Sequence, residues 1–194
     1  NNQDIVDSIY NGSATVATSP IPKITTGHNE NSNPYTQNIE KAKELLAEAG
    51  YADGFNIVLN VNEDNQRVDT AVVIQDNLKA IGINVEIKTY QWASYVAFVE
   101  NPAQEKGMFL MAWNIANDDP DELLYPLYHS SQIDAHTNVV FYKNEDFDNL
   151  ISKARETTDK EKRIDLYKKA QDIIQEELIS NIGLFMKLLR KKKG

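Results

Sequence analysis

The chain of 194 residues carries 20 Lys+Arg against 29 Asp+Glu, for a formal net charge of −9, and 41% of its residues are hydrophobic. This length fits one domain or at most two, and it allows a core large enough to fold without covalent cross-links. The sequence contains no cysteine, which excludes disulfides and thiolate metal sites.

The basic residues are unevenly placed. Residues 187–194 contain Lys187, Arg190, Lys191, Lys192 and Lys193 and no acid, so the rest of the chain is more acidic than the total suggests. An acidic surface repels phosphate backbones, which argues against nucleic acid as a partner. We interpret residues 187–194 as a basic tail, either a solvated end or a non-native addition. No apolar stretch approaches the roughly 20 residues that span a bilayer.

The first 38 residues are predicted to form a helix and then an arm. Ile5, Val6 and Ile9 are spaced as on a helix already under way at the start of the chain. Residues 11–38 are rich in Ser, Thr, Asn, Gly and Pro, which is typical of an extended arm over a surface. We therefore expect a helix remnant and a surface arm over residues 1–38.

Helices and strands alternate in the next part of the chain, which begins at Asn38, a suitable N-cap. Apolar residues at helical spacing predict helices over residues 39–49, 66–81 and 91–99. Period-two alternation predicts strands over residues 55–61 and 83–89. Two strands that are separated by an amphipathic helix form a βαβ unit, so we expect these strands to be parallel. Residues 108–113 are apolar without alternation, which predicts a central strand covered on both faces.

The acidic run over residues 118–122 permits two interpretations, a cation site or the start of a helix. Asp119 fits an N-cap, Pro120 fits the first helical position, and the Glu122 carboxylate would reach back to the cap amide. A calcium loop needs oxygen ligands at alternating positions and a glycine at the turn, and this pattern is missing. The run therefore favours a helix start.

The last third of the chain is predicted to be helical. Apolar stripes indicate one helix around residues 147–154 and a longer one over residues 159–178, and residues 182–188 indicate a short strand or an apolar run. The complete pattern predicts an α/β fold, with a mixed sheet flanked by helices, in one lobe over residues 39–186.

The sequence contains none of the common catalytic motifs. His28, His129 and His136 have no zinc-protease spacing, and neither a nucleophile elbow nor a phosphate-binding glycine loop is present. We therefore predict no catalytic residue, no metal site and no cofactor. A carboxylate-dependent hydrolase stays open as an alternative, because 29 acids permit many carboxylate pairs.

Aromatic and amide side chains gather where the predicted strands end. They are Asn62, Tyr90, Trp92, Trp113, Asn114 and Asn117. Ligands of parallel α/β sheets bind outside the carboxyl ends of the strands, where such groups offer flat apolar contact and hydrogen bonds. The alternative interpretation is that Trp92 and Trp113 are simply core residues.

Several segments, taken together and in order, resemble the extracellular solute-binding proteins of family 5, the dipeptide and oligopeptide receptors of ABC importers. The matching segments are residues 39–55, residues 78–87, Trp113 with Asp119-Pro120-Asp121, residues 125–131, residues 142–148 and residues 159–163. The resemblance covers nearly the whole chain. It implies the C-terminal lobe of a two-lobed periplasmic-binding-protein-like (type II) fold that closes over its ligand.

The resemblance also implies a function. Such a receptor performs no catalysis, binds a peptide in the cleft between its lobes and passes it to the transmembrane permease of an ABC importer. It works outside the cytoplasm, in the periplasm or on the outer face of the cell membrane. It contacts the membrane through a lipid anchor, which would lie outside this chain. Members for oligosaccharides or nickel complexes are the alternative within the same class.

The ligand-side positions of the family fall on five residues of this chain. They are Asn62, Trp92, Trp113, Asn114 and Asn138. We expect them to line one face and to be partly exposed. This chain departs from the family at Ala116, where peptide-binding members carry an Asp that pairs with the free amino group of the ligand. The resemblance therefore implies that Asp118 or another acid replaces it, or that the ligand lacks that amine.

Overall fold

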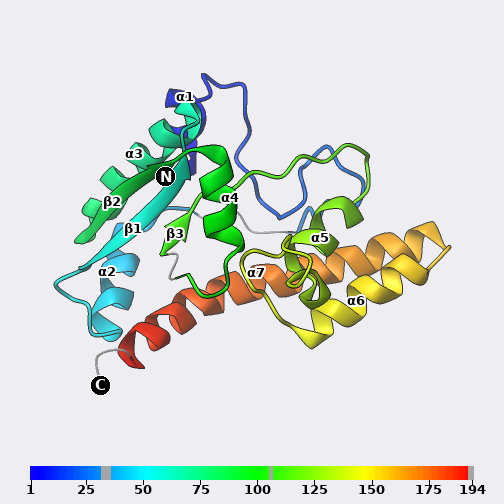
Figure 1. The fold of residues 1–194 in the computed structure, drawn as a ribbon. Coiled ribbons are helices and arrows are strands. Elements are labelled where there is room, and N and C mark those ends of the chain that lie inside the picture. Colours follow the sequence, from blue (N-terminus) through cyan, green and yellow to red (C-terminus); the bar gives the residue numbers. More distant parts are fainter. Residues whose placement is uncertain (32–35, 105–106, 192–194) are drawn as a thin grey trace. The chain divides into compact units, whose positions relative to one another are not determined.

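The computed structural model describes residues 1–31, 36–104 and 107–191, and its elements follow one another as helices with three interposed strands. They are α1 (Asn2–Ser8), α2 (Ile39–Glu48), β1 (Phe55–Asn62), α3 (Asn65–Lys79), β2 (Ile83–Tyr90), α4 (Trp92–Glu100), β3 (Met108–Phe109), α5 (Asp121–Tyr128), a 3-10 turn η1 (Ser130–Gln132), α6 (Glu145–Glu156) and α7 (Lys160–Lys191) (Figure 1). Parts of the predicted arm (32–35) and of the basic tail (192–194) lie outside the described residues.

The chain divides into two compact units. Unit 1 contains residues 1–16, 36–112 and 180–191, and unit 2 contains residues 17–31 and 113–179. Unit 1 holds the sheet, whereas the elements of unit 2 are helical. The single lobe over residues 39–186 stays a prediction about domain boundaries.

The sheet of unit 1 has the order β2-β1-β3, and all its pairs are parallel. β1 and β2 pair along their whole length, from Phe55 opposite Ile83 to Asn62 opposite Tyr90 (Figure 1). The predicted βαβ unit is confirmed, with α3 packed against both strands. The parallel register brings the carboxyl ends of β1 and β2 to one edge of the sheet.

Two local features, one of which was predicted, precede β1 and set where it begins. Asn38 caps α2 by accepting a hydrogen bond from the Lys41 N–H at 2.9 Å. After α2 the chain turns through Gly54, whose φ is +74°. A Cβ on Gly54 would lie 1.8 Å from the carbonyl oxygen of Gly82, so only glycine fits this close approach of the two strand starts.

The third strand is much shorter than predicted, and it lies at an edge of the sheet. β3 pairs with β1 only through Met108 and Phe109. The central strand is β1, so the prediction of a central strand over residues 108–113 is wrong. The prediction rested on apolar composition alone. Met111 and Trp113, however, are 38% and 41% exposed, in the segment where the chain leaves the sheet for unit 2.

Each unit has its own apolar core. In unit 1 the core joins residues of α2, both long strands and α3, and its buried members are Leu46, Ala49, Tyr51, Leu59, Val61, Ala71, Ile83 and Val85. In unit 2 the core joins Ile21 of the N-terminal arm to the helices α5, α6 and α7. The arm segment around Ile21 is therefore a structural part of unit 2, since this side chain is only 1% exposed.

The C-terminal helix α7 is longer than predicted. It runs from Lys160 to Lys191, so the alternative of a short strand over residues 182–188 is wrong. The sequence contains no proline in this stretch, and Gly183 alone does not end a helix. Within the described residues, no helix is long and apolar enough to cross a bilayer.

Candidate functional site

Two of the predicted ligand residues lie together at the carboxyl edge of the sheet in unit 1. Asn62 ends β1, and Trp92 opens α4 directly after β2. The Trp92 side chain is 49% exposed, so the core interpretation is wrong for this residue. Asn62 is only 8% exposed, which contradicts the expectation that it is partly exposed. Its burial follows from its partner in α3.

That partner is Arg67, a residue that the sequence analysis missed. Its Nη1 donates to Asn62 Oδ1 at 2.5 Å, and its guanidinium carbon lies 5.7 Å from the centre of the Trp92 ring. Arg67 is held in the first turn of α3, because Asp64 caps this helix and accepts from the Arg67 N–H at 3.0 Å. Asp64 as an N-cap three residues before an arginine, directly after a strand, was the signal available in the sequence.

The backbone below this edge is fixed by buried tyrosine and asparagine side chains. Asn60 accepts from the Tyr90 hydroxyl at 3.0 Å and donates to the Met108 carbonyl at 3.1 Å. The Tyr95 hydroxyl donates to the carbonyls of Asn60 and Leu110. Burial raises the pKa of Tyr95 to about 12, so this phenol stays protonated and able to donate even well above neutral pH. These hydrogen bonds connect β1 to β2, β3 and α4 directly beside the edge that carries Asn62 and Trp92.

Trp113 and Asn114 lie in unit 2, in the exposed segment that precedes α5. Trp113 is 41% exposed and its Nε1 donates to the Glu122 carbonyl at 2.8 Å, so the core interpretation is wrong here too. The Glu122 carboxylate accepts from the N–H groups of Ala116 at 2.7 Å and Asn117 at 2.9 Å. These bonds, above all the one from the Asn117 N–H, lower the pKa of Glu122.

The start of α5 differs in detail from the prediction. Pro120 occupies the cap position, and the helix begins at Asp121. The Glu122 side chain bonds to the segment before the helix instead of the cap amide, because the backbone of residues 116–117 turns its N–H groups toward it. Asp119 accepts from the Asp121 N–H at 2.9 Å and pairs with Arg163 at 3.0 Å. The acidic run thus organises a helix start.

Asp118 is hydrogen-bonded to Thr26 of the N-terminal arm. Its two carboxylate oxygens accept from the N–H and the hydroxyl of Thr26. These hydrogen bonds, the hydroxyl first, lower the pKa of Asp118. Both oxygens of Asp118 therefore already accept hydrogen bonds within the chain.

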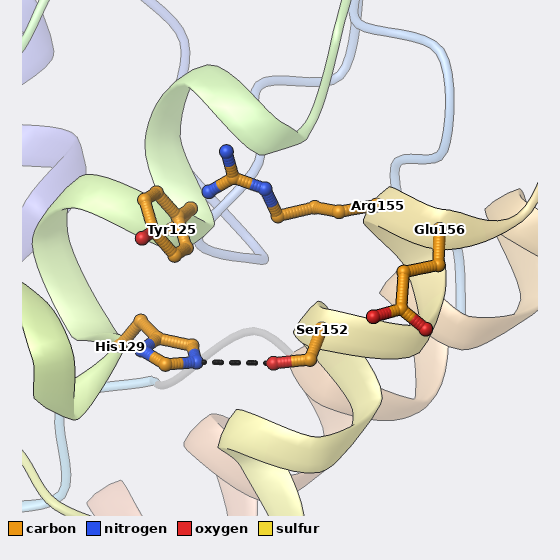
Figure 2. A pocket seen from close by; sticks show the side chains of 5 residues that line it. All are labelled: Tyr125, His129, Ser152, Arg155 and Glu156. Carbon is orange, nitrogen blue, oxygen red and sulfur yellow. Dashed lines mark hydrogen bonds between the residues drawn. The ribbon is translucent and has the colours of Figure 1, made fainter.

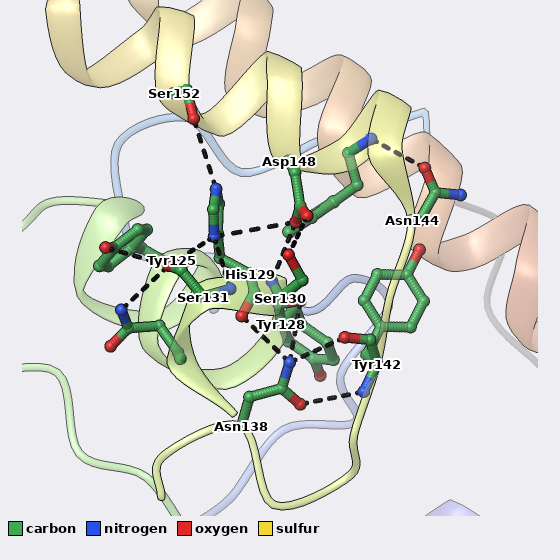
Figure 3. Close-up of polar contacts among 12 residues, drawn as sticks. Tyr125, Tyr128, His129, Ser130, Ser131, Asn138, Tyr142, Asn144, Asp148 and Ser152 are labelled. Carbon is green, nitrogen blue, oxygen red and sulfur yellow. Dashed lines mark hydrogen bonds and ion pairs between the residues drawn. The ribbon is translucent and has the colours of Figure 1, made fainter. Parts of the chain in front are cut away.

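Asn138 is fully buried in unit 2, which contradicts the expectation of partial exposure. Its Nδ2 donates to the carbonyls of Tyr128, His129 and Tyr142 at 2.9–3.2 Å, and its Oδ1 accepts from the Tyr142 N–H at 3.1 Å (Figure 3). A spacing argument could not show this, because an Asn that cross-links loop carbonyls has the same sequence signature as an exposed one. The ligand-binding role of the five residues stays a prediction.

Unit 2 also carries a surface pocket of about 270 Å³, between α5 and α6. It is lined by Tyr125, His129, Ser152, Arg155 and Glu156 (Figure 2). Small-molecule sites usually enclose roughly 300–1,000 Å³. None of the five residues predicted to bind ligand lines this pocket.

Two residues that line the pocket, Ser152 and His129, lie with Asp148 in the order of a catalytic triad. His129 Nε2 is 3.3 Å from Ser152 Oγ, and His129 Nδ1 is 3.9 Å from Asp148 Oδ1 (Figure 3). However, His129 Nδ1 accepts from the Ser131 N–H at 3.2 Å, so in the neutral ring Nε2 holds the proton. A protonated Nε2 cannot accept the proton of Ser152, as a triad requires. Asp148 instead binds the N–H and hydroxyl of Ser130.

The parallel sheet carries an amide, an indole and a guanidinium at its carboxyl edge, where α/β proteins of this kind place their ligand sites. Residues 1–135 match the family "Bacterial extracellular solute-binding proteins, family 5 Middle". The chain belongs to this family.

Individual relatives agree in sequence and in fold. The chain is 35% identical to Heme-binding protein A of Haemophilus influenzae, over 89% of this chain and 32% of that protein. It is 30% identical to the Dipeptide-binding protein of Escherichia coli, over 100% of this chain and 38% of that protein. The periplasmic binding protein DppA of Helicobacter pylori, solved with the peptide STSA, superposes with a TM-score of 0.83 at 36% identity, over 90% of this chain and 34% of that one.

These matches establish the fold class. The chain has the α/β fold found in periplasmic binding proteins, as predicted. It spans about a third of the length of the relatives that it matches.

Proposed function

We propose that this chain is part of the substrate-binding component of an ABC importer, which binds peptides outside the cytoplasm and passes them to a membrane permease. The observation that carries this proposal is the family match over residues 1–135. The carboxyl edge of β1 and β2 is consistent with it, because an exposed indole and buried amides suit a ligand with both flat and polar groups. A lipid anchor would hold the receptor at the membrane.

Peptides are the solute class that the comparisons favour. A relative that matches the whole chain is a dipeptide-binding protein, and a solved structure of similar fold contains a peptide. Asn62, Trp92, Trp113 and Asn114 are the residues that we propose to contact the peptide, with Trp92 and Trp113 supplying exposed indole rings. Asn138 is proposed to act indirectly, through the loops that it holds together.

A solute without a free α-amine is the second candidate. The residue at position 116 is an alanine, and the nearby carboxylates of Asp118 and Glu122 are engaged by backbone N–H groups. A related protein at 35% identity is named for heme, which is not a peptide. The two candidates differ in one measurable property, the need for a free amino group on the solute.

We also propose that the protein has no enzymatic activity. The one triad-like arrangement described above has its histidine proton on the wrong nitrogen for general-base catalysis. Incubation with the peptides that it binds should return them unchanged, and release of shorter peptides would favour the hydrolase alternative.

A capture experiment tests the proposed function. The protein in its natural length is incubated with a synthetic library of di- to pentapeptides built from Ala, Phe, Lys and Glu, each with a free and an acetylated amino end. Retained molecules are released and identified by mass spectrometry. Retention of free peptides supports the peptide receptor, equal retention of acetylated ones indicates that the α-amine is not read, and retention of none contradicts peptide binding.

A further inference from the structure

The surface pocket of unit 2 combines an aromatic wall with two exposed side chains of opposite charge. Tyr125 and His129 form the wall, with their ring centres 5.0 Å apart. Arg155 and Glu156, at the end of α6, provide the charges and border the same hollow of about 270 Å³ (Figure 2). Ser152 completes the lining, with its Oγ 3.3 Å from His129 Nε2. None of these residues belongs to unit 1, which carries the carboxyl edge of the sheet.

The fold holds the Arg155 guanidinium in place without using its hydrogen-bond donors. Its central carbon lies 3.5 Å from the centre of the Tyr125 ring, so the cation rests on an aromatic face. Its Nε lies 3.8 Å from Asp121 Oδ2, which is an ion pair but too long for a hydrogen bond. Among the described residues, none accepts a hydrogen bond from this guanidinium. Its planar fork of N–H groups is therefore available to a carboxylate.

Glu156 provides the complementary charge. Its side chain is exposed, and it forms no ion pair with any residue in the part of the chain that the structure describes. Figure 2 shows its carboxylate turned toward the hollow, across from Tyr125. Arg155 and Glu156 are the charged residues of the lining, one of each sign. Charge complementarity therefore favours a ligand that carries both signs over a simple anion or cation.

We propose that the pocket between α5 and α6 is a second binding site, which takes a free α-amino acid with an aromatic side chain. The α-carboxylate binds the guanidinium of Arg155, and the α-ammonium binds Glu156, both through charge-assisted hydrogen bonds. The aromatic ring of the ligand packs against His129, whose ring adjoins Tyr125. The volume of about 270 Å³ lies just below the roughly 300–1,000 Å³ of drug-sized sites, which suits a single amino acid better than a peptide.

Three matched probes test the two charges separately. L-Phenylalanine carries both charges, phenylpropionate lacks the ammonium, and phenethylamine lacks the carboxylate. Ligand-observed NMR titrations at neutral pH give dissociation constants for the protein in its natural length, as wild type, Arg155→Gln and Glu156→Gln. The matched controls are Lys153→Gln and Glu145→Gln, which remove one charge of each sign from exposed positions of α6 outside the pocket. Circular dichroism and thermal unfolding verify that every variant is folded.

We expect phenylpropionate and phenethylamine each to bind the wild type about fivefold more weakly than L-phenylalanine or worse, because each lacks one charge-assisted contact. Arg155→Gln should weaken L-phenylalanine by a similar factor and leave phenethylamine unchanged. Glu156→Gln should weaken L-phenylalanine without weakening phenylpropionate, and both controls should match the wild type.

Three results would overturn the proposal. The first is no binding of L-phenylalanine up to its solubility limit, and the second is equal binding of the three probes by the wild type. The third is a loss of L-phenylalanine binding in Trp92→Ala with none in Glu156→Gln, because that pattern places the amino acid at the carboxyl edge of the sheet. Each of these results leaves the proposed peptide receptor standing, since the capture of peptides is measured separately.

Discussion

Polar side chains are used differently in the two units of this chain. In unit 2, several buried and half-buried groups bond to one another, as Asn138 does with three carbonyls and as Arg163 does with Asp119. In unit 1, the carboxyl edge of the sheet leaves an indole exposed and a guanidinium without an ion pair among the described residues. The first arrangement stabilises the fold, whereas the second leaves exposed groups at the edge that we propose to bind the ligand.

This difference helps to separate polar residues that stabilise the fold from polar residues that are candidates for binding. A polar residue that the sequence places in a loop has a structural role when its hydrogen-bonding capacity is filled within the chain. The Ser152, His129 and Asp148 cluster shows this, because every contact that suggests catalysis is explained by hydrogen bonds that hold loop and helix together. Replacing residues of each kind should therefore give separable effects on stability and on binding.

The largest effect on stability is expected in the core of unit 2. Phe147 is fully buried, with its ring 5.5 Å from Tyr142 and 6.2 Å from Tyr128. Phe147→Ala should lower the free energy of unfolding by about 3–5 kcal/mol, because it leaves a cavity. Urea unfolding measures this, with Val140→Ala, at a site that is 52% exposed, as the control. A loss no larger than that of the control would contradict the packing described here.

The next effect concerns Asn138. Asn138→Ala leaves three carbonyls and the Tyr142 N–H without this partner, so we expect a loss of about 2–4 kcal/mol in the free energy of unfolding. Asn114→Ala is the matched control, because Asn114 is exposed and should change stability by less than about 0.5 kcal/mol. If the two variants unfold at the same urea concentration, Asn138 does not hold the loops of unit 2 together.

A smaller effect should depend on pH. Hydrogen bonds from Thr26 hold the pKa of Asp118 below its ordinary value of 3.8. A lowered pKa in the folded state contributes stability above the ordinary pKa, and this contribution is lost as pH falls through the folded value. The wild type should therefore exceed Asp118→Asn in stability at about pH 5, and this difference should shrink toward about pH 2. Urea unfolding at a series of pH values measures it, and a difference independent of pH would contradict it.

Much of the fold was predictable because its signals are local. The alternation in 55–61 and 83–89 and the cap at Asn38 each depend on residues close in sequence, and β1, β2 and α2 formed as predicted. The prediction of the third strand failed because the length of a strand depends on its pairing partners elsewhere in the chain. Met111 is apolar, as expected in a buried strand. Beyond Phe109, however, the described ladder to β1 continues only through one hydrogen bond, from the Leu110 N–H to the Asn60 carbonyl at 3.2 Å.

The place of the candidate site could be predicted from the sequence, but the full set of residues that form it could not. The rule that ligands bind at the carboxyl ends of parallel strands leads from the sequence to Asn62 and Trp92, and the structure brings these two together. Asp64 marks the start of a helix in the sequence, but Arg67 was missed because its contacts with Asn62 and Trp92 depend on how α3 packs beside β1 and β2. Asn138 was assigned to an exposed surface because burial of a loop amide has no sequence pattern.

The most direct test of whether the carboxyl edge of β1 and β2 serves binding more than stability is a paired measurement of both quantities on Trp92→Ala. The control is Val72→Ala, which shortens another exposed apolar side chain of unit 1, 43% exposed on α3. For Trp92→Ala we predict binding of the captured peptide about tenfold weaker or more, with a free energy of unfolding within about 1 kcal/mol of the wild type. The control should change neither quantity appreciably. Peptide binding by Trp92→Ala that equals the wild type would contradict the claim that the carboxyl edge of β1 and β2 is the ligand-binding surface.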